Sequence, residues 1–308
     1  MKKDYDSTKI YRKTQKKGAS QTYDTPSSSS TRNTIATRHN SIVQRINFDF
    51  RKVNSTSNTL YVGSYGRNTA TENISDVDML MILPYSTYLQ YNAYLYNGQS
   101  SLLQAVKTSL ATTYPRTILK GDGQIVQVTF SDGNTFEILP CFENTDGSFT
   151  YPDSNDGGSW KTTNPRPEIK AFHDLNNVCN GNLYALCRMA RAWKYFYNIS
   201  LKSCLLDLFA YRFLQNYQYK DKSYTYYDWM ARDFFAYLAY IPKTQNSWRM
   251  VGSNRIYTDY SSFQNKAKKA KDKCVEAIEN ASKGYVYSAY CNWREILGTK
   301  FPNKYVIE

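Results

Sequence analysis

Two aspartates separated by one residue, Asp76 and Asp78, are the side chains of this sequence whose type and spacing point most directly to chemistry. In an extended strand alternate side chains share a face, so both carboxylates project together while Val77 turns into the core. Two carboxylates held side by side repel each other unless a cation lies between them. The pair therefore predicts a site for a divalent cation, Mg²⁺ or alternatively Mn²⁺.

A glycine-led segment, Gly63-Ser64-Tyr65-Gly66-Arg67, lies shortly before the aspartates. Glycine and serine at the end of an apolar run are typical of a tight turn, and the backbone N–H groups and hydroxyl of such a turn can hold a phosphate. We expect the Ser64 hydroxyl to donate to a terminal phosphate, with the Gly63 and Tyr65 backbone close by. Arg67 either contacts phosphate or ties the turn to a neighbouring acid. Together with the aspartates, the segment predicts a site for Mg²⁺ and a nucleoside triphosphate.

The alternative interpretation is that Asp-x-Asp lies on a solvated loop and Gly-Ser is an ordinary turn. The apolar run 79–83 after the second aspartate favours a buried strand instead. Burying a strand with two carboxylates at its mouth would be costly without a compensating metal, so the functional interpretation is favoured.

The elements that must position these side chains divide the chain into two halves. Helical and strand patterns alternate up to residue 141, with a helix from about Thr37 to Phe50, a short helix after Gly66 and a crossover helix at 98–113. One strand is expected to end at Gly63, and further strands are expected at 76–83, 116–120, 124–130 and 134–141. A loop is expected at 143–167, and the pattern beyond it is helical, near 168–178, 182–197, 203–218, 226–241, 261–282 and 285–297. This predicts an α/β (α+β) fold: a catalytic lobe with a mixed sheet, then an α-helical lobe, with the active site in the cleft between them.

Composition makes several functional classes improbable for this protein. Six cysteines without paired spacing and only two histidines make a zinc finger or a histidine-based hydrolase improbable. The chain has no apolar run long enough to span a bilayer and no secretory start, so we expect a cytoplasmic protein without a membrane partner. The formal charge of +13 indicates a polyanionic partner, either nucleotide or nucleic acid.

Two basic regions contribute to that charge. Residues 1–36 are rich in serine and threonine and are expected to be mobile. A lysine cluster lies on a predicted C-terminal helix and comprises Lys266, Lys268, Lys269, Lys271 and Lys273. A solvated helix face is the favoured interpretation of the cluster, and nucleic-acid binding is the alternative.

The pattern Gly-Ser-x-Gly-Arg-x-Thr followed by Ser-Asp-Val-Asp resembles the signature of polymerase-beta-type nucleotidyltransferases, in the branch of oligoadenylate synthetase, cGAS and the bacterial cGAS/DncV-like enzymes (CD-NTases). That family carries a third carboxylate on a neighbouring strand, before two apolar residues and a proline. Glu137 in Glu137-Ile138-Leu139-Pro140 fits, although the family most often has aspartate there. The turn Asp132-Gly133 predicts a hairpin whose second strand places Glu137 beside the aspartate strand.

The resemblance continues to about residue 302. Trp160 to Pro165 resembles the loop that joins the two halves of CD-NTases, and 186–194 and 203–206 resemble two family helices. The resemblance implies that Arg191, where lysine is usual, and Ser203 contact the triphosphate; the alternatives are a surface ion pair and a helix cap. It also implies boundaries at 1–36 for the mobile segment, 37–165 for the catalytic lobe and 166–308 for the helical lobe.

The function that the resemblance implies is condensation of NTPs into a cyclic di- or trinucleotide second messenger, with two metal ions held by Asp76, Asp78 and Glu137 and with release of pyrophosphate. The expected setting is bacterial anti-phage (CBASS) signalling, with a separate effector protein that senses the product. A nucleic-acid activator is the less favoured possibility. The alternatives are a linear or poly(A)/CCA-type nucleotidyltransferase and a catalytically silent nucleic-acid-binding relative. For base stacking, Tyr197, Tyr211 and Tyr217 are candidates among 29 tyrosines.

Overall fold

The computed structural model describes residues 29–71, 76–299 and 301. The chain divides into two compact units, and the division between residues 169 and 170 falls inside helix α7 (Arg166–Val178). The first unit, residues 27–169, contains the sheet, and the second, from residue 170 onward, is helical. The predicted order of an α/β part followed by a helical part is confirmed.

The first unit is built on a mixed seven-stranded sheet with a path β1-β2-β5-β4-β3, extended from β5 by β6 and then β7. Only the contact between β2 and β5 is parallel, and every other pairing in this sheet is antiparallel. The strands are β1 (Thr59–Tyr61), β2 (Asp76–Ile82), β3 (Ile118–Asp122), β4 (Ile125–Thr129), β5 (Thr135–Glu143), β6 (Phe149–Asp153) and β7 (Ser159–Thr163).

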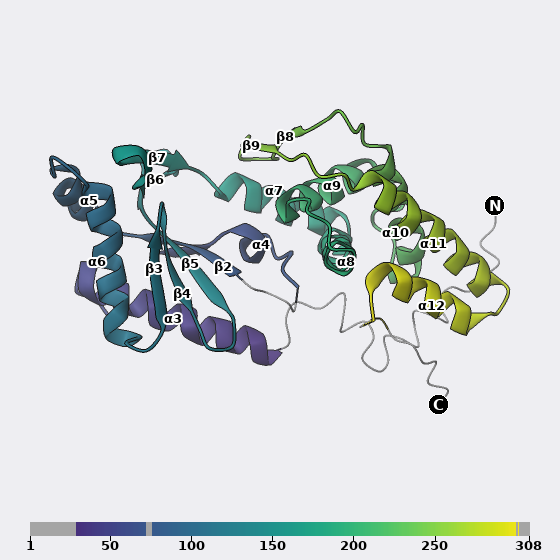
Figure 1. The fold of residues 1–308 in the computed structure, drawn as a ribbon, viewed down its shortest axis with the longest axis horizontal. Coiled ribbons are helices and arrows are strands. Elements are labelled where there is room, and N and C mark those ends of the chain that lie inside the picture. Colours follow the sequence, from purple (N-terminus) through teal and green to yellow (C-terminus); the bar gives the residue numbers. More distant parts are fainter. Residues whose placement is uncertain (1–28, 72–75, 300, 302–308) are drawn as a thin grey trace. The chain divides into compact units, whose positions relative to one another are not determined.

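Helices α3 (Ser29–Arg51) and α6 (Gly98–Thr113) cover one face of this sheet (Figure 1). Their apolar side chains form a single core with alternate residues of the strands, including Val77 and Met79 of β2 and Phe136 of β5. Because neighbouring residues of a strand point to opposite faces, the residues between these core positions project from the other face. The alternation predicted for Asp-Val-Asp is confirmed, since Val77 is fully buried.

Two segments of the first unit differ from the sequence-based expectation. The span 143–167, expected as a loop, contains the β6–β7 hairpin, turned by a short 3₁₀ helix (Asn155–Gly157), and the first residues of α7. Helix α5 (Tyr85–Asn92) was not expected. The hairpin was missed because Pro152 lies inside β6, where proline is unusual, and because Gly157 and Gly158 in its turn favour a loop.

The second unit packs its helices around an aromatic core that includes Trp193, Phe209 and Phe234. Its elements after α7 are α8 (Asn182–Phe196), α9 (Ser203–Asn216), a 3₁₀ turn (Tyr224–Tyr226), α10 (Tyr227–Tyr240), the small hairpin of β8 (Ser247–Arg249) and β9 (Ile256–Thr258), α11 (Gln264–Ser282) and α12 (Val286–Leu297). The predicted helices are present, and the β8–β9 hairpin was missed. All six cysteines are free thiols.

Helix α3 begins before the position predicted for it. The helix starts at Ser29, not near Thr37, and Ile35 is fully buried in the core of the first unit. The rest of the segment 1–36 that was predicted to be mobile, residues 1–28, lies outside the described residues. Among the helices of the described residues, none is long and apolar enough to cross a membrane.

Candidate active site

The parallel contact between β2 and β5 places two of the predicted carboxylates side by side. Asp78 and Glu137 are register partners, and Asp76 is level with Thr135. Adjacent strands lie about 4.8 Å apart, so the two side chains of a register pair are direct neighbours. Asp76, Asp78 and Glu137 all project from the face of the sheet opposite α3 and α6. The structure therefore brings the three predicted carboxylates to one face.

The environment of Asp78 disfavours its charged form. Burial, followed by the charges of Glu137 and Asp76, raises the pKa of Asp78 to about 6, and a hydrogen bond with Glu137 adds to the increase. The charge of Arg67 acts in the opposite direction. Without a cation, the ionised form of Asp78 is therefore unfavourable in this position.

We expect Asp78→Asn to stabilise the metal-free protein at pH 8. The carboxyl of Asp78 has a pKa of about 6 in the fold against an ordinary value of 3.8, so its ionised form destabilises the fold by up to roughly 3 kcal/mol above pH 6. This cost decreases as the pH falls from 6 and is absent below about 3.8. Unfolding by denaturant in EDTA should therefore show a gain at pH 8 that disappears near pH 4.

Asp122→Asn is the matched control for this comparison, because Asp122 is exposed and forms only a surface ion pair with Lys120. Its free energy of unfolding should stay within about 0.5 kcal/mol of that of the wild type. An Asp78→Asn protein no more stable than the wild type at pH 8 would contradict the unfavourable ionisation of Asp78 inferred here.

The turn before the aspartates comes into direct contact with Asp78. Helix α4 (Gly63–Gly66) is a single turn that begins at Gly63, whereas a helix after Gly66 had been predicted. Gly63 has a positive φ of 59°, and a Cβ at this position would lie 1.9 Å from Asp78 Oδ2. Only glycine satisfies both conditions, because any side chain would clash with the carboxylate. The backbone of the predicted phosphate turn thus passes directly over one of the predicted metal ligands.

The other residues of the turn are held in place by local contacts. The Thr69 N–H donates to the carbonyl oxygen of Ser64 at 2.9 Å, and the Val62 N–H donates to the carbonyl oxygen of Asp78 at 3.0 Å. The Tyr65 ring lies 4.6 Å from the Tyr61 ring, centroid to centroid. These contacts join the turn to β1 and β2, while the phosphate-binding roles of Gly63, Ser64 and Tyr65 stay predictions.

Arg67 forms an ion pair with Glu168 at the start of α7. The Arg67 Nη1 to Glu168 Oε1 distance is 2.5 Å, and both side chains are buried. A charge-assisted hydrogen bond of this kind is strong and leaves the guanidinium directed at the carboxylate. Of the two roles considered for Arg67, the structure supports a tie between the turn and a neighbouring acid.

The two predicted triphosphate contacts of the helical unit, Arg191 and Ser203, lie on consecutive helices. Arg191 of α8 donates from Nε to Oδ1 of the fully buried Asp207 of α9 at 2.9 Å, and from Nη2 to Oδ2 at 2.5 Å. Ser203 is the half-buried first residue of α9. Arg191 therefore has a structural partner, and the contact of either residue with a triphosphate stays a prediction.

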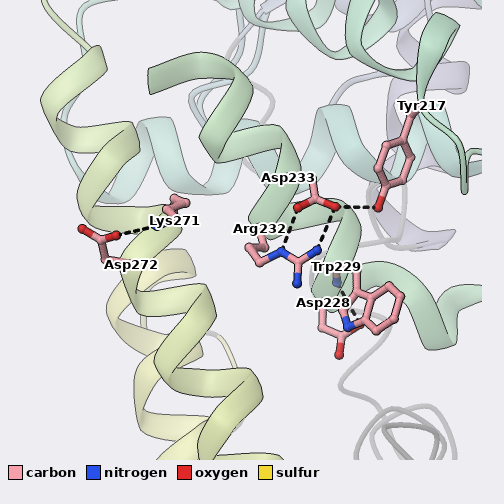
Figure 2. Close-up of polar contacts among 7 residues, drawn as sticks. All are labelled: Tyr217, Asp228, Trp229, Arg232, Asp233, Lys271 and Asp272. Carbon is pink, nitrogen blue, oxygen red and sulfur yellow. Dashed lines mark hydrogen bonds and ion pairs between the residues drawn. The ribbon is translucent and has the colours of Figure 1, made fainter. Parts of the chain in front are cut away.

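The three tyrosines considered for base stacking all have contacts within the helical unit. Tyr197 donates to the Glu295 carbonyl at 2.6 Å, and Tyr211 packs against Phe172. Figure 2 shows the Tyr217 hydroxyl directed at Asp233 of α10, at 3.0 Å, with Arg232 holding the same carboxylate from the other side. A packing role accounts for each of these tyrosines, and no base-stacking residue is assigned.

Two site residues were not predicted. Gln127 of β4 is the register partner of Glu137 and donates from its side-chain amide to Glu137. Glu168 is the partner of Arg67, at a separation of 101 residues. The Asp132-Gly133 turn could have indicated Gln127, since counting outward from that turn pairs it with Glu137. No local signal indicates Glu168.

The sequence is similar to a described protein family. Residues 13–176 match the Second Messenger Oligonucleotide or Dinucleotide Synthetase domain. Because this match covers more than half of the chain, the protein belongs to this family of cGAS/DncV-like nucleotidyltransferases. The resemblance seen in the glycine turn and the paired aspartates is confirmed, as is the nucleotidyltransferase class.

Two curated relatives are similar along most of their length. A probable cyclic nucleotide synthase of Bacillus cereus (strain VD146) is 22% identical over 291 residues, with 83% of this chain and 85% of the relative covered. A cyclic AMP-AMP-AMP synthase of Acinetobacter sp. (strain ATCC 27244 / 9458) is 23% identical over 297 residues, with 89% and 81% covered.

Solved structures show the same fold. E. coli MS115-1 CdnC, determined with ATP, superposes with a TM-score of 0.60 at 17% identity and covers 96% of this chain and 99% of its own. Vibrio cholerae DncV, a cyclic AMP-GMP synthase, has a TM-score of 0.57 at 13% identity, with 80% of this chain and 69% of its own covered. The predicted polymerase-beta-type fold is confirmed by these similarities.

Proposed function

We propose that this protein condenses NTPs into a cyclic di- or trinucleotide with release of pyrophosphate, in a reaction that depends on two divalent cations. The observation that carries the proposal is the Asp78–Glu137 register pair on two parallel strands, level with the glycine turn and on the same face as Asp76. The names of the relatives, which include cyclic nucleotide and cyclic AMP-AMP-AMP synthases, support a cyclic product.

The carboxylates have the chemistry that a hard cation requires. Mg²⁺ and Mn²⁺ prefer oxygen ligands, and three carboxylates on one face supply them. Among the described residues no group of three or more His, Cys, Asp or Glu side chains forms a complete metal site. Burial and the neighbouring negative charges raise the pKa of Asp78 to about 6, and a cation would offset this unfavourable ionisation. We infer that Asp76, Asp78 and Glu137 hold the cations together with the phosphates of the substrate. Bound cations would neutralise phosphate charge and lower the pKa of the attacking hydroxyl.

The chain's own groups position the triphosphate in this proposal. The absence of a side chain at Gly63 lets phosphate oxygens approach the backbone next to Asp78, and the Ser64 hydroxyl donates to a terminal phosphate. Arg67 acts indirectly, by tying this turn to Glu168. Arg191 and Ser203 contribute triphosphate contacts from the helical unit, with Arg191 oriented by Asp207.

Incubation with the four NTPs and Mg²⁺, then phosphatase treatment and mass spectrometry, tests the proposal. A phosphatase-resistant cyclic product supports it. A ladder of linear products would indicate a linear or poly(A)/CCA-type transferase, and unchanged NTPs would indicate a silent relative. Omission of single NTPs would identify the bases, and nuclease digestion would distinguish 2′–5′ from 3′–5′ linkages.

The proposed setting is bacterial anti-phage (CBASS) signalling, in which a separate effector protein senses the cyclic product. A regulatory protein partner is also consistent with a related structure, CdnC of E. coli MS115-1, which was solved in a complex named CdnC:HORMA-deltaN. That structure has a TM-score of 0.60 and 15% identity. Co-expression with the products of neighbouring genes, followed by purification and a turnover assay, would test for such a partner.

We expect the lysines of α11 to be dispensable for turnover. Lys268 and Lys269 are exposed, whereas Lys266 donates to the Tyr197 carbonyl at 3.0 Å and has a structural role. Replacing Lys268 and Lys269 by glutamine should change turnover by less than about twofold, because solvated lysines contribute little beyond long-range charge. A DNA-dependent rate that falls steeply with salt and is lost in this variant would instead establish a nucleic-acid activator.

A deletion that tests the N-terminal basic residues must end before the first residue of α3. Deleting residues 1–35 would remove Ile35, a fully buried core residue, so a loss of activity in that variant would report unfolding. Deletion of residues 1–26 leaves the whole of the first unit in place and tests the N-terminal basic residues without this complication.

A further inference from the structure

Gln127 lies in the middle of β4, opposite Glu137 of β5. Its Nε2 donates to Glu137 Oε1 at a distance of 3.0 Å. Both its neighbours in the strand, Val126 and Val128, are fully buried on the other face, so the amide projects from the face that carries the carboxylates. Gln127 is therefore a neutral donor placed directly beside the third carboxylate.

Glu137 has a neighbour on each side in the sheet. Gln127 donates a hydrogen bond to it from β4, whereas Asp78, its register partner on β2, carries a like charge that repels it. A glutamate has one more rotatable bond than an aspartate, so a free side chain samples more positions and loses more entropy when it binds a ligand. A hydrogen bond to one carboxylate oxygen restricts those positions and leaves the second oxygen available.

We infer that Gln127 is a positioning residue of the reaction, which fixes the orientation of Glu137 toward Asp78. This inference rests on the proposed role of Glu137 as a cation ligand. Residues that orient a ligand in this way typically contribute 10–100-fold in cation affinity or activity. The amide is suited to this role because it donates a hydrogen bond without adding a charge that would compete with the cation.

The same pair of strands provides a matched comparison. Thr129 and Thr135 are the next register pair on this face, and their hydroxyls lie 3.1 Å apart. This pair is also a cross-strand hydrogen bond between β4 and β5, but it does not contact Glu137. A general contribution to sheet stability should therefore be similar for both pairs, whereas an effect that acts through the orientation of Glu137 should be specific to Gln127.

The test begins with Gln127→Met, which keeps the length of the side chain and removes the donor, and Thr129→Val as control. Binding of Mn²⁺ to the nucleotide-free protein is measured by calorimetry, and kcat and KM by product formation. We expect Gln127→Met to weaken Mn²⁺ binding and lower kcat by about 10–100-fold with a smaller change in KM, and Thr129→Val to stay within about twofold of the wild type.

A double-mutant cycle with Glu137→Asp then identifies the cause. Aspartate is shorter by one methylene and loses the contact with Gln127, so adding Gln127→Met to Glu137→Asp should have no further effect on Mn²⁺ binding. Additive effects, or a Gln127→Met protein that binds Mn²⁺ like the wild type, would overturn the inference. Because this cycle does not use turnover, coupling in an otherwise inactive protein would reject the proposed function and keep the positioning role.

Discussion

Asp78→Asn and Asp76→Ala should each reduce nucleotide condensation by at least about a thousandfold while leaving the protein folded. A loss of this size corresponds to roughly 4 kcal/mol of transition-state stabilisation, which is in the range that a metal ion contributes to phosphate chemistry. Folding should survive because both residues lie on the face of the sheet away from the core, and because burial and neighbouring negative charge make ionised Asp78 unfavourable in the fold. Product formation by mass spectrometry, together with circular dichroism, provides the measurement.

The control for these variants is again Asp122→Asn, at an exposed carboxylate of the same sheet. It should retain the wild-type rate. If Asp78→Asn or Asp76→Ala kept that rate in a folded protein, the assignment of the carboxylate face as the active site would be wrong.

Glu137→Gln should separate catalysis from substrate binding. The amide preserves the shape of the side chain, and Gln127 can still be its neighbour, but a neutral group is a much weaker ligand for a hard cation. We expect kcat to fall by at least about a hundredfold while the Kd for a non-hydrolysable NTP changes by less than about fivefold, because Asp76, Asp78 and the glycine turn still hold the triphosphate. Calorimetric titration and single-turnover assays would measure the two quantities.

A parallel loss of binding and catalysis would show that Glu137 has a structural role. The variant Glu143→Gln offers a comparison at the exposed end of the same strand, where Glu143 pairs with Arg166. This substitution should affect neither quantity, since Glu143 follows the core positions of β5 and is remote in register from Asp78.

Local patterns predicted the carboxylate pair because strand alternation and the Asp132-Gly133 turn are both short-range signals. The turn has three residues, closed by a hydrogen bond from the Phe130 N–H to the Asn134 carbonyl, with Gly133 at a positive φ of 86°. These features determine the β4–β5 register and so the level of Glu137. To predict the contact between Glu137 and Asp78, one further assumption was needed, that β5 lies beside β2.

Long-range partners could not be predicted in this way. Whether Arg67 faces a phosphate or an acid depends on where Glu168 lies, and nothing in either local segment specifies that contact. The same holds for Arg191, whose partner Asp207 is fully buried on the next helix. The β6–β7 hairpin was missed for a different reason: its pairing with β5 overrides the weak strand propensity of Pro152 in β6.

The parallel pairing of β2 with β5 also determines when the carboxylate pair can form. Asp78 and Glu137 are far apart in sequence, and α6 and the β3–β4 hairpin lie between them. A contact of such high sequence separation has a large loop-closure cost and is slow to form compared with the local hairpin. A partly synthesised or partly folded chain therefore lacks the pair, and the proposed cation site forms only after the central strands have joined.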